Sequence, residues 1–286
     1  MPSPTEHLTP AVLRDWPLPA PGTSKYSRGE VVVVGGARST PGAAMLAGIA
    51  ALRAGAGRLT LAVARSVAVQ VAVTIPEAGV RGLPETEAGS PDGTGTDVLD
   101  DDLGADAILV GPGLDDPDRT TDLLQALVPR VSKKTPMLLD AYALGVLPRV
   151  ADVADSLAGR LVLTPNATEA ALLLGVDEIS DDASSRIAAT YGAVVTCRGR
   201  IASPDGRTWT MTTGSSGLAT SGSGDVLAGV LVGLLARGAD AAQATCWATH
   251  LHAAAGDRLA ARVGRVGYLA RELVDEIPAL LTELSA

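Results

Sequence analysis

The sequence predicts an α/β fold in which a mostly parallel β-sheet is covered by helices on both faces. Three observations lead to this prediction. Short runs of β-branched residues and leucine, such as Val31–Val34, are continuous rather than alternating with polar residues, which is typical of strands buried on both faces. These runs alternate along the chain with segments of helical spacing. Glycine or a polar side chain follows most of them, at the strand ends where ligands of such folds bind.

The predicted elements follow one another in regular order. Strands are expected at Val31–Val34, Leu59–Val63, Ala107–Val110, Met137–Leu139, Leu161–Leu163, Ala193–Cys197 and 207–212. Helices are expected over Pro41–Ala54 and Asp118–Leu127, and after Asp225 until Gly238 ends the segment. Residues 81–106, rich in Gly, Pro, Asp, Glu and Thr, are predicted to be an exposed loop with little structure. Residues 1–24 are predicted to form an N-terminal arm, and residues 25–286 a single domain.

Composition excludes several classes of partner. The 286 residues carry a net charge of −9, which favours neither a nucleic-acid backbone nor an anionic membrane. Aromatic residues make up 2% of the chain and Phe is absent, which argues against base-stacking nucleic-acid modules. Cys197 and Cys246 are predicted to be buried thiols in a reducing compartment, and the N-terminus shows no secretory signal. We therefore expect a cytoplasmic protein that binds neither nucleic acid nor membrane.

The most informative segment is GLATSGSGDVLAGVLVGLLARG at residues 217–238. A loop of small residues, 221–224, leads into Asp225, and apolar residues at helical spacing follow. Backbone N–H groups at a helix start attract a phosphate, and glycines let that backbone approach the anion closely. A carboxylate beside these groups is well placed to take a proton from a hydroxyl that attacks a phosphoryl group. The alternative is that Asp225 only caps a core helix.

Two further motifs follow predicted strands. Asn166 and Glu169 have the offset of a helix capping box, and the same pair would suit magnesium-bound water and phosphate oxygens. The Arg-Gly-Arg segment at 198–200 either clamps phosphates or forms a charged turn. His250 and His252 lie two residues apart on a helix and face different directions, so we interpret both as structural.

Taken in this order, the motifs resemble the ribokinase-like superfamily, and most closely its nucleotide-dependent NAD(P)H-hydrate dehydratases. The resemblance runs from about Lys25 to the end of the chain. It rests on VVVVGG, PGAAMLAGIAALRAGAGRLT, ILVGPGL, LLDAYAL, LTPNATEAALLLG, the segment at 217–238 and the tail HLHAAAGDRLAARVGRVGYLARELVDEIPALL. It implies a ribokinase-like three-layer sandwich with a mostly parallel central sheet.

The resemblance also implies an activity, the repair of the S form of NADH hydrate and NADPH hydrate. Such an enzyme phosphorylates the hydroxyl at C6 of the damaged nicotinamide with ADP, or ATP, and Mg²⁺, and loss of phosphate restores the ring double bond. Asp225 would be the catalytic base, and Glu169 the candidate magnesium contact through water. The implied substrate contacts are Ala43, Gly113, Asn166 and Asp225. The implied nucleotide contacts are Arg198, Gly199, Arg200, Ile201, Ala202, Gly222 and Gly224.

Three positions depart from the pattern of this family. Asn166 stands where many bacterial members have His, Arg198 where Lys is usual, and Tyr142 where Asp is expected. Arg198 keeps the charge of Lys but changes the geometry of the nucleotide loop. The resemblance further implies a homo-oligomer, a tetramer, and a separate NAD(P)H-hydrate epimerase as functional partner. Two rival hypotheses are a small-molecule kinase of the same superfamily, acting on a vitamin precursor or sugar, and a non-catalytic nucleotide-binding homologue.

Overall fold

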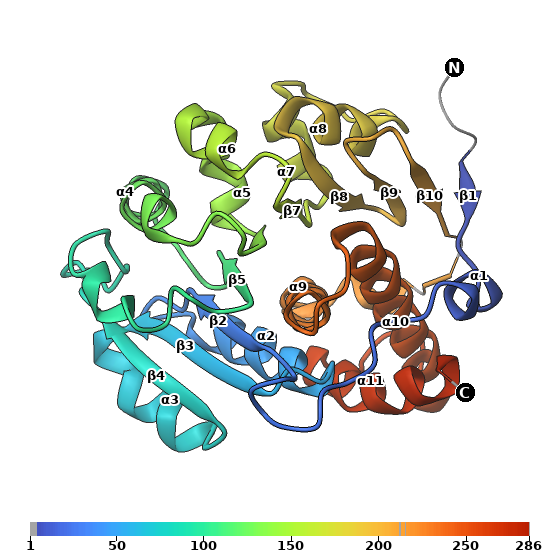
Figure 1. The fold of residues 1–286 in the computed structure, drawn as a ribbon, viewed down its shortest axis with the longest axis horizontal. Coiled ribbons are helices and arrows are strands. Elements are labelled where there is room, and N and C mark those ends of the chain that lie inside the picture. Colours follow the sequence, from blue (N-terminus) through green and yellow to red (C-terminus); the bar gives the residue numbers. More distant parts are fainter. Residues whose placement is uncertain (1–4, 212, 215, 286) are drawn as a thin grey trace.

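The computed structural model describes residues 5–211, 213–214 and 216–285. Within these residues a ten-stranded sheet has the order β1-β10-β9-β8-β7-β6-β5-β2-β3-β4 (Figure 1). The strands span Glu6–His7 (β1), Glu30–Val34 (β2), Arg58–Ala64 (β3), Ala78–Leu83 (β4), Ala107–Val110 (β5), Met137–Leu139 (β6), Leu161–Leu163 (β7), Ala193–Cys197 (β8), Arg200–Ala202 (β9) and Thr208–Thr210 (β10). All neighbours from β8 to β4 are parallel, whereas β9 is antiparallel to β8 and β10.

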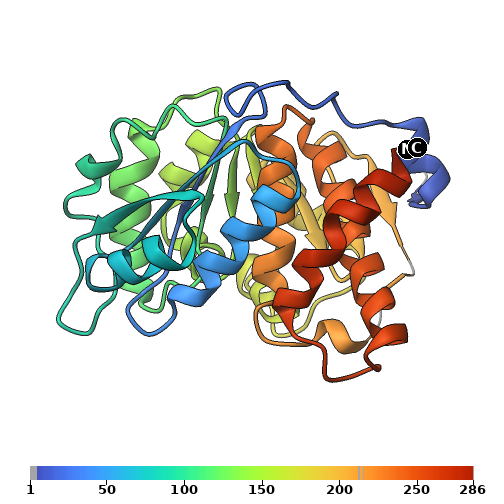
Figure 2. The ribbon, with the colours of Figure 1, turned by 90° about the horizontal axis from the view of Figure 1, so that it is seen from below.

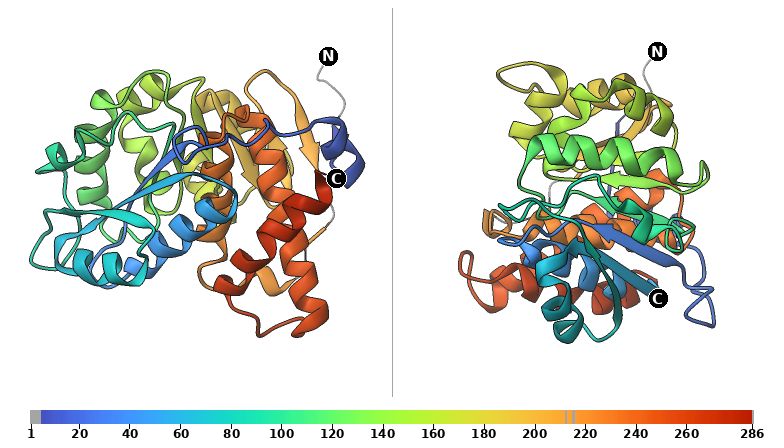
Figure 3. Two further views of the ribbon diagram at one scale, coloured as in Figure 1. Left: turned by 60° about the horizontal axis from the view of Figure 1, so that its bottom comes forward. Right: turned by 90° about the vertical axis from the view of Figure 1, so that its left-hand side faces the viewer.

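Helices cover both faces of this sheet. They span Pro10–Asp15 (α1), Pro41–Arg53 (α2), Ala68–Thr74 (α3), Pro117–Leu127 (α4), Tyr142–Val146 (α5), Ala151–Leu157 (α6), Ala167–Leu174 (α7), Ala183–Tyr191 (α8), Ser223–Ala236 (α9), Ala241–Arg262 (α10) and Ala270–Leu284 (α11). Helices α2, α9, α10 and α11 share one face, and α4 to α8 lie on the other (Figures 1 and 3). The predicted three-layer α/β sandwich is confirmed.

Each face of the sheet has its own apolar core, as the continuous valine run of β2 predicts. Val31 and Val33 belong to the core shared with α2, α9, α10 and α11. Val32 and Val34 point the other way, into the core beneath α4 to α8. All four side chains are fully buried, because successive residues of a strand face opposite sides.

Helices α2 and α9 pack very closely side by side (Figure 2). A Cβ atom at Gly229 of α9 would lie 2.2 Å from the carbonyl oxygen of Ala47 in α2. One turn later, a Cβ atom at Gly233 would lie 2.6 Å from the carbonyl oxygen of Ala51. Glycine is therefore required at both positions, because any side chain would collide with the backbone of α2. This contact fixes the start of α9 relative to α2.

Helix α9 differs from the prediction only at its start. It begins at Ser223 rather than after Asp225, and Gly238, with a φ of +88°, follows its last residues as predicted. It is apolar and buried around most of its circumference, since other helices and the sheet surround it. In the part of the chain that the structure describes, no helix combines the length and apolarity needed to cross a bilayer.

The prediction that residues 81–106 form an exposed loop with little structure holds only in part. From residue 84 on, the segment is mostly turns with a short 3-10 helix at Thr96–Leu99, but it begins inside a strand and several of its residues are buried. Strand β4 runs to Leu83 and pairs in parallel with β3, and Leu83 and Leu99 are both fully buried. Asp102 is also buried, where it accepts hydrogen bonds from Arg81 and Thr60. The polar composition is misleading here because an edge strand keeps charged residues, and because buried partners satisfy the Asp102 carboxylate.

The predicted N-terminal arm contributes elements to the fold. Strand β1 pairs in parallel with β10, and Leu13 of α1 is fully buried. The indole of Trp16 stacks on that of Trp209, with ring centroids 5.9 Å apart. Residues 1–4 of the arm, and residue 212 of the strand predicted at 207–212, lie outside the described residues.

Candidate active site

The N-terminus of α9 lies at the end of the small-residue loop. Gly222 is the N-cap, with a φ of +87°, and a Cβ atom there would lie 2.7 Å from Leu46 of α2. The Ser223 N–H donates to Thr220 and the Val226 N–H donates to Gly222. The N–H groups between them, those of residues 224 and 225, therefore remain available to an anion, as expected for a first helical turn.

Asp225 stands in this first turn and is not the helix cap, so the alternative that it only caps the helix does not hold. Its carboxylate oxygen would lie 3.8 Å from a Cβ atom at Gly222. Burial raises the pKa of Asp225 to about 7, and the nearby charge of Asp140 adds to the rise. A carboxyl with such a pKa exchanges protons readily near neutral pH, as a general base must.

Asp140 directly follows β6, at the strand end where ligands of such folds bind, but no role was predicted for it. It is buried, and the Thr164 hydroxyl donates to its carboxylate over 2.9 Å. Burial raises its pKa to about 6, against the lowering effect of hydrogen bonds from Thr164 and the Ala141 backbone. A Cβ atom at Gly111 would lie 1.8 Å from the Asp140 carbonyl oxygen, which explains the glycine that follows β5.

Asn166 and Glu169 form the capping box that their spacing predicts at the start of α7. The Glu169 N–H donates to Asn166 Oδ1 over 3.0 Å, and the Asn166 N–H donates to Glu169 Oε2 over 2.8 Å. The pKa of Glu169 is raised to about 7, chiefly by burial and also by the charge of Asp140. Asp140, Glu169 and Asp225 together are called the carboxylate cluster below.

A cleft of about 590 Å³ opens beside this cluster, at the carboxyl ends of β7 and β8. Four residues predicted for the site line it, namely Asn166, Arg198, Gly199 and Gly224. The other lining residues are Thr164, Pro165, Ala167, Thr196, Met211, Thr213, Gly214, Leu218, Ala219, Ser223, Leu227, Thr249, His252 and Ala253. The interpretation of His252 as purely structural is therefore incomplete. Position 252 follows position 249 by three, which places both on one helix face, but only the folded chain shows that this face meets the cleft.

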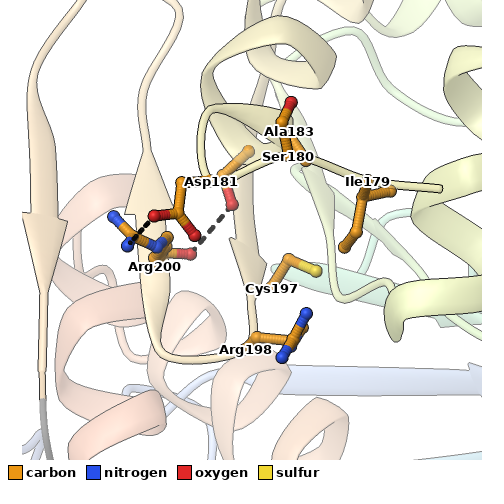
Figure 4. Close-up of a pocket in the computed structure, with 8 residues that line it drawn as sticks. Ile179, Ser180, Asp181, Ala183, Cys197, Arg198 and Arg200 are labelled. Atoms are coloured by element: carbon orange, nitrogen blue, oxygen red, sulfur yellow. Dashed lines mark hydrogen bonds and ion pairs between the residues drawn. The ribbon is translucent and has the colours of Figure 1, made fainter.

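The segment at 198–200 is the tight turn between β8 and β9. Arg198 and Gly199 both have positive φ, +51° and +74°, and Cys197 pairs with Arg200 across the turn. The Arg200 guanidinium forms an ion pair with Asp181 over 2.8 Å, and both residues line a second pocket of about 240 Å³, which Arg198 also lines (Figure 4). Of the two arginines only Arg198 lines the cleft of about 590 Å³, and Arg200 is already paired with Asp181, so this arrangement favours the charged turn over a clamp in that cleft.

The remaining predicted site residues occupy two other places. Ile201 and Ala202 are buried in β9, each 1% exposed, and they do not line the cleft. Ala43 and Gly113 lie side by side at the start of α2, since a Cβ atom at Gly113 would lie 3.1 Å from that of Ala43. The Thr40 hydroxyl donates to the Gly113 carbonyl over 2.8 Å and holds this pair together.

Comparison with known proteins gives consistent results. A model of the NAD(P)H-hydrate dehydratase family matches residues 31–279. The ADP-dependent (S)-NAD(P)H-hydrate dehydratase of Xanthomonas campestris pv. campestris is 44% identical over 97% of this chain and 96% of its own. The chain also matches bifunctional NAD(P)H-hydrate repair enzymes, of which it covers about half the length.

Two solved structures are similar throughout. A ribokinase-like superfamily protein from Enterococcus faecalis superposes with a TM-score of 0.84 at 24% identity, over 98% of this chain and 96% of that one. The ADP/ATP-dependent NAD(P)H-hydrate dehydratase of Bacillus subtilis, crystallised with ATP and Mg²⁺, superposes with a TM-score of 0.79 at 25% identity. That match covers 98% of this chain and 99% of the other. The fold is therefore ribokinase-like.

Proposed function

Because the chain belongs to the NAD(P)H-hydrate dehydratase family, we infer that it is an ADP-dependent (S)-NAD(P)H-hydrate dehydratase. It restores NADH and NADPH from the S forms of their hydrates and consumes a nucleotide in doing so. The single observation in the fold that carries this conclusion is the first turn of α9. There, free backbone N–H groups and a carboxyl with a pKa of about 7 stand next to each other.

We propose the following sequence of steps. The Asp225 carboxylate takes the proton of the C6 hydroxyl, and the resulting oxygen attacks the terminal phosphorus of ADP. The bond between that phosphorus and the bridging oxygen breaks, and AMP leaves. The N–H groups of Gly224 and Asp225 stabilise the charge on the transferred phosphoryl group. The C6–O bond then breaks with loss of inorganic phosphate, a proton leaves the neighbouring ring carbon, and the ring double bond is restored.

The proposed nucleotide contacts and the proposed substrate contacts lie in two neighbouring regions, and α2 and α9 contribute to them. The nucleotide is placed in the cleft of about 590 Å³, against Arg198, Gly199 and Gly224. The damaged nicotinamide is placed between Asp225 and the neighbouring pair Ala43 and Gly113. Leu46 supports this arrangement, since it lies on α2 one turn after Ala43 and lies beside Gly222. Asn166 borders the cleft and is proposed to meet the substrate.

We propose that Mg²⁺ binds through water beside Glu169 and Asp140, where it would neutralise phosphate charge. The carboxylate cluster fits a cation, because the negative charge of Asp140 raises the pKa of both Glu169 and Asp225. Direct ligation is not supported, since no group of three or more His, Cys, Asp or Glu side chains in the described residues is placed to hold an ion.

Further parts of the proposal rest on the family resemblance. They are a homotetramer, a separate NAD(P)H-hydrate epimerase that supplies the S form, and a single domain over residues 25–286. A cytoplasmic location is proposed from the two cysteines, which are free and buried.

The test uses NADH hydrate, purified protein and Mg²⁺ with ADP, with ATP or without nucleotide. We expect the near-ultraviolet absorbance of reduced nicotinamide to recover only with a nucleotide, together with release of inorganic phosphate. Asp225→Asn should lower the rate by at least the 10²- to 10⁴-fold typical of general-base catalysis, with ADP affinity largely unchanged. A stable phosphorylated product without recovered absorbance would indicate the rival kinase. Near-normal activity of the Asp225→Asn variant would exclude Asp225 as the base.

A further inference from the structure

A buried hydrogen bond joins α10 to the start of α9, at the edge of the cleft. His252 Nε2 and Ser223 Oγ lie 2.8 Å apart. Their residues are 9% and 3% exposed, so water competes little for this contact, and both line the cleft. Neither residue has a part in the reaction steps described above.

His252 is a neutral imidazole at physiological pH. Burial lowers its pKa to about 4, and a hydrogen bond with the backbone of Ser223 offsets only part of this effect. The contact between Nε2 and the Ser223 hydroxyl allows two tautomers, and in the one that carries the hydrogen on Nε2 the ring donates to Oγ.

This orientation determines what the Ser223 hydroxyl can do. If Nε2 donates to Oγ, the hydroxyl keeps its own hydrogen free to donate elsewhere. The backbone N–H of Ser223 is already bonded to the Thr220 carbonyl, so it cannot serve an anion together with the N–H groups of Gly224 and Asp225. The hydroxyl is then the donor that residue 223 can offer to the cleft.

We propose that the Ser223 hydroxyl, oriented by His252, donates a hydrogen bond to the terminal phosphate of ADP, and that His252 is a positioning residue for it. The proposal deepens the dehydratase function and rests on it for the identity of the nucleotide. Ser223 would add one side-chain donor to the two backbone donors at the start of α9. A hydroxyl polarised in this way binds a charged phosphate more strongly than a free one, because hydrogen bonds in a chain reinforce one another.

The test compares the affinities of ADP and AMP, measured calorimetrically without hydrate. AMP lacks the terminal phosphate, so a lost contact to that phosphate changes the affinity of ADP alone. From the usual strength of hydrogen bonds to charged groups, we expect Ser223→Ala and His252→Leu each to weaken the binding of ADP by about 10- to 100-fold. Ser223→Thr and His252→Gln keep the hydroxyl and the donor, and should stay near the wild-type value. His250→Leu makes the same change two residues away, at a position that does not line the cleft, and should leave ADP affinity unchanged.

The double variant Ser223→Ala with His252→Leu distinguishes the proposal from the alternative that the hydrogen bond only stabilises the packing of α9 against α10. If His252 acts through Ser223, the double variant binds ADP no worse than the weaker single variant. Three results would overturn the proposal. The first is a double variant whose loss of ADP affinity is the product of the two single losses, and the second is an equal loss of affinity for ADP and AMP. The third is a His252→Gln variant that binds ADP as weakly as His252→Leu. If His252→Leu does not fold, the pairs Ser223→Ala with Ser223→Thr and wild type with His252→Gln still test it.

The binding measurements also separate this inference from the proposed function. A wild-type protein that fails to restore NADH from its hydrate contradicts the dehydratase function but leaves the comparison of ADP with AMP valid. A wild-type protein that restores NADH while Ser223→Ala binds ADP and AMP unchanged contradicts the role of Ser223 alone.

Discussion

Replacing Asp225 by Asn is expected to stabilise the folded protein while it abolishes turnover. The pKa of this carboxyl is about 7 in the folded chain, against an ordinary value of 3.8, mainly because of burial. At about 1.36 kcal/mol for each tenfold change in proton affinity, the upper limit of the destabilisation is about 4 kcal/mol. Asp225 is only partly buried, so we expect about 2 kcal/mol, which corresponds to a rise in Tm of about 3 °C.

The pH dependence provides the assay. The folded state binds more protons than the unfolded state between pH 3.8 and about 7, so this carboxyl costs stability as the pH rises through that range and the full cost is present above it. Thermal unfolding in metal-free, nucleotide-free buffer should give nearly equal Tm values for wild type and Asp225→Asn at pH 4, and a growing advantage of the variant towards pH 8. Asp101→Asn, at an exposed position, is the matched control and should show no such divergence. A variant that is less stable at pH 8, or a difference independent of pH, would refute the reasoning.

Two further predictions concern the fold. Gly229→Ala should lower the free energy of unfolding by about 1–3 kcal/mol in urea, because its Cβ atom would meet the Ala47 carbonyl oxygen at 2.2 Å. Gly145→Ala in α5, with nothing within 4 Å of the added atom, should instead be neutral or gain up to about 1 kcal/mol, and equal losses in both variants would contradict this packing argument. Arg81→Leu should cost about 1–3 kcal/mol, because it leaves the buried Asp102 carboxylate with only one of its two side-chain donors. An unchanged urea midpoint for Arg81→Leu would mean that the carboxylate is satisfied in another way.

The core of the sheet could be predicted from the sequence because its strands are buried on both faces. The run Val31–Val34 is apolar at every position, and such a run is typical of a strand whose two faces are both buried. Edge elements do not carry this signal. Strand β4 includes Arg81 and two glycines, and the two-residue strand β1 is too short to show a period, so both were missed.

The candidate site could be predicted where one local segment supplies the chemistry. The loop before Asp225 shows both its glycines and its carboxylate in sequence, and the capping box of Asn166 and Glu169 needs only an offset of three residues. Asp140 and His252 could not be assigned in this way. Their roles depend on which side chains lie near them, and those side chains come from other strands and helices.

The sequence by itself determined the fold class, the presence of a helix after the small-residue loop and the family, because each of these depends on short-range pattern. Only the tertiary structure decided how the segments meet. It placed Asp140 near enough to Glu169 and to Asp225 to raise the pKa of both, and it paired Arg200 with Asp181 outside the cleft of about 590 Å³ that Arg198 lines. Burial and the distance between charges are properties of the packed chain, and for that reason no local pattern contains them.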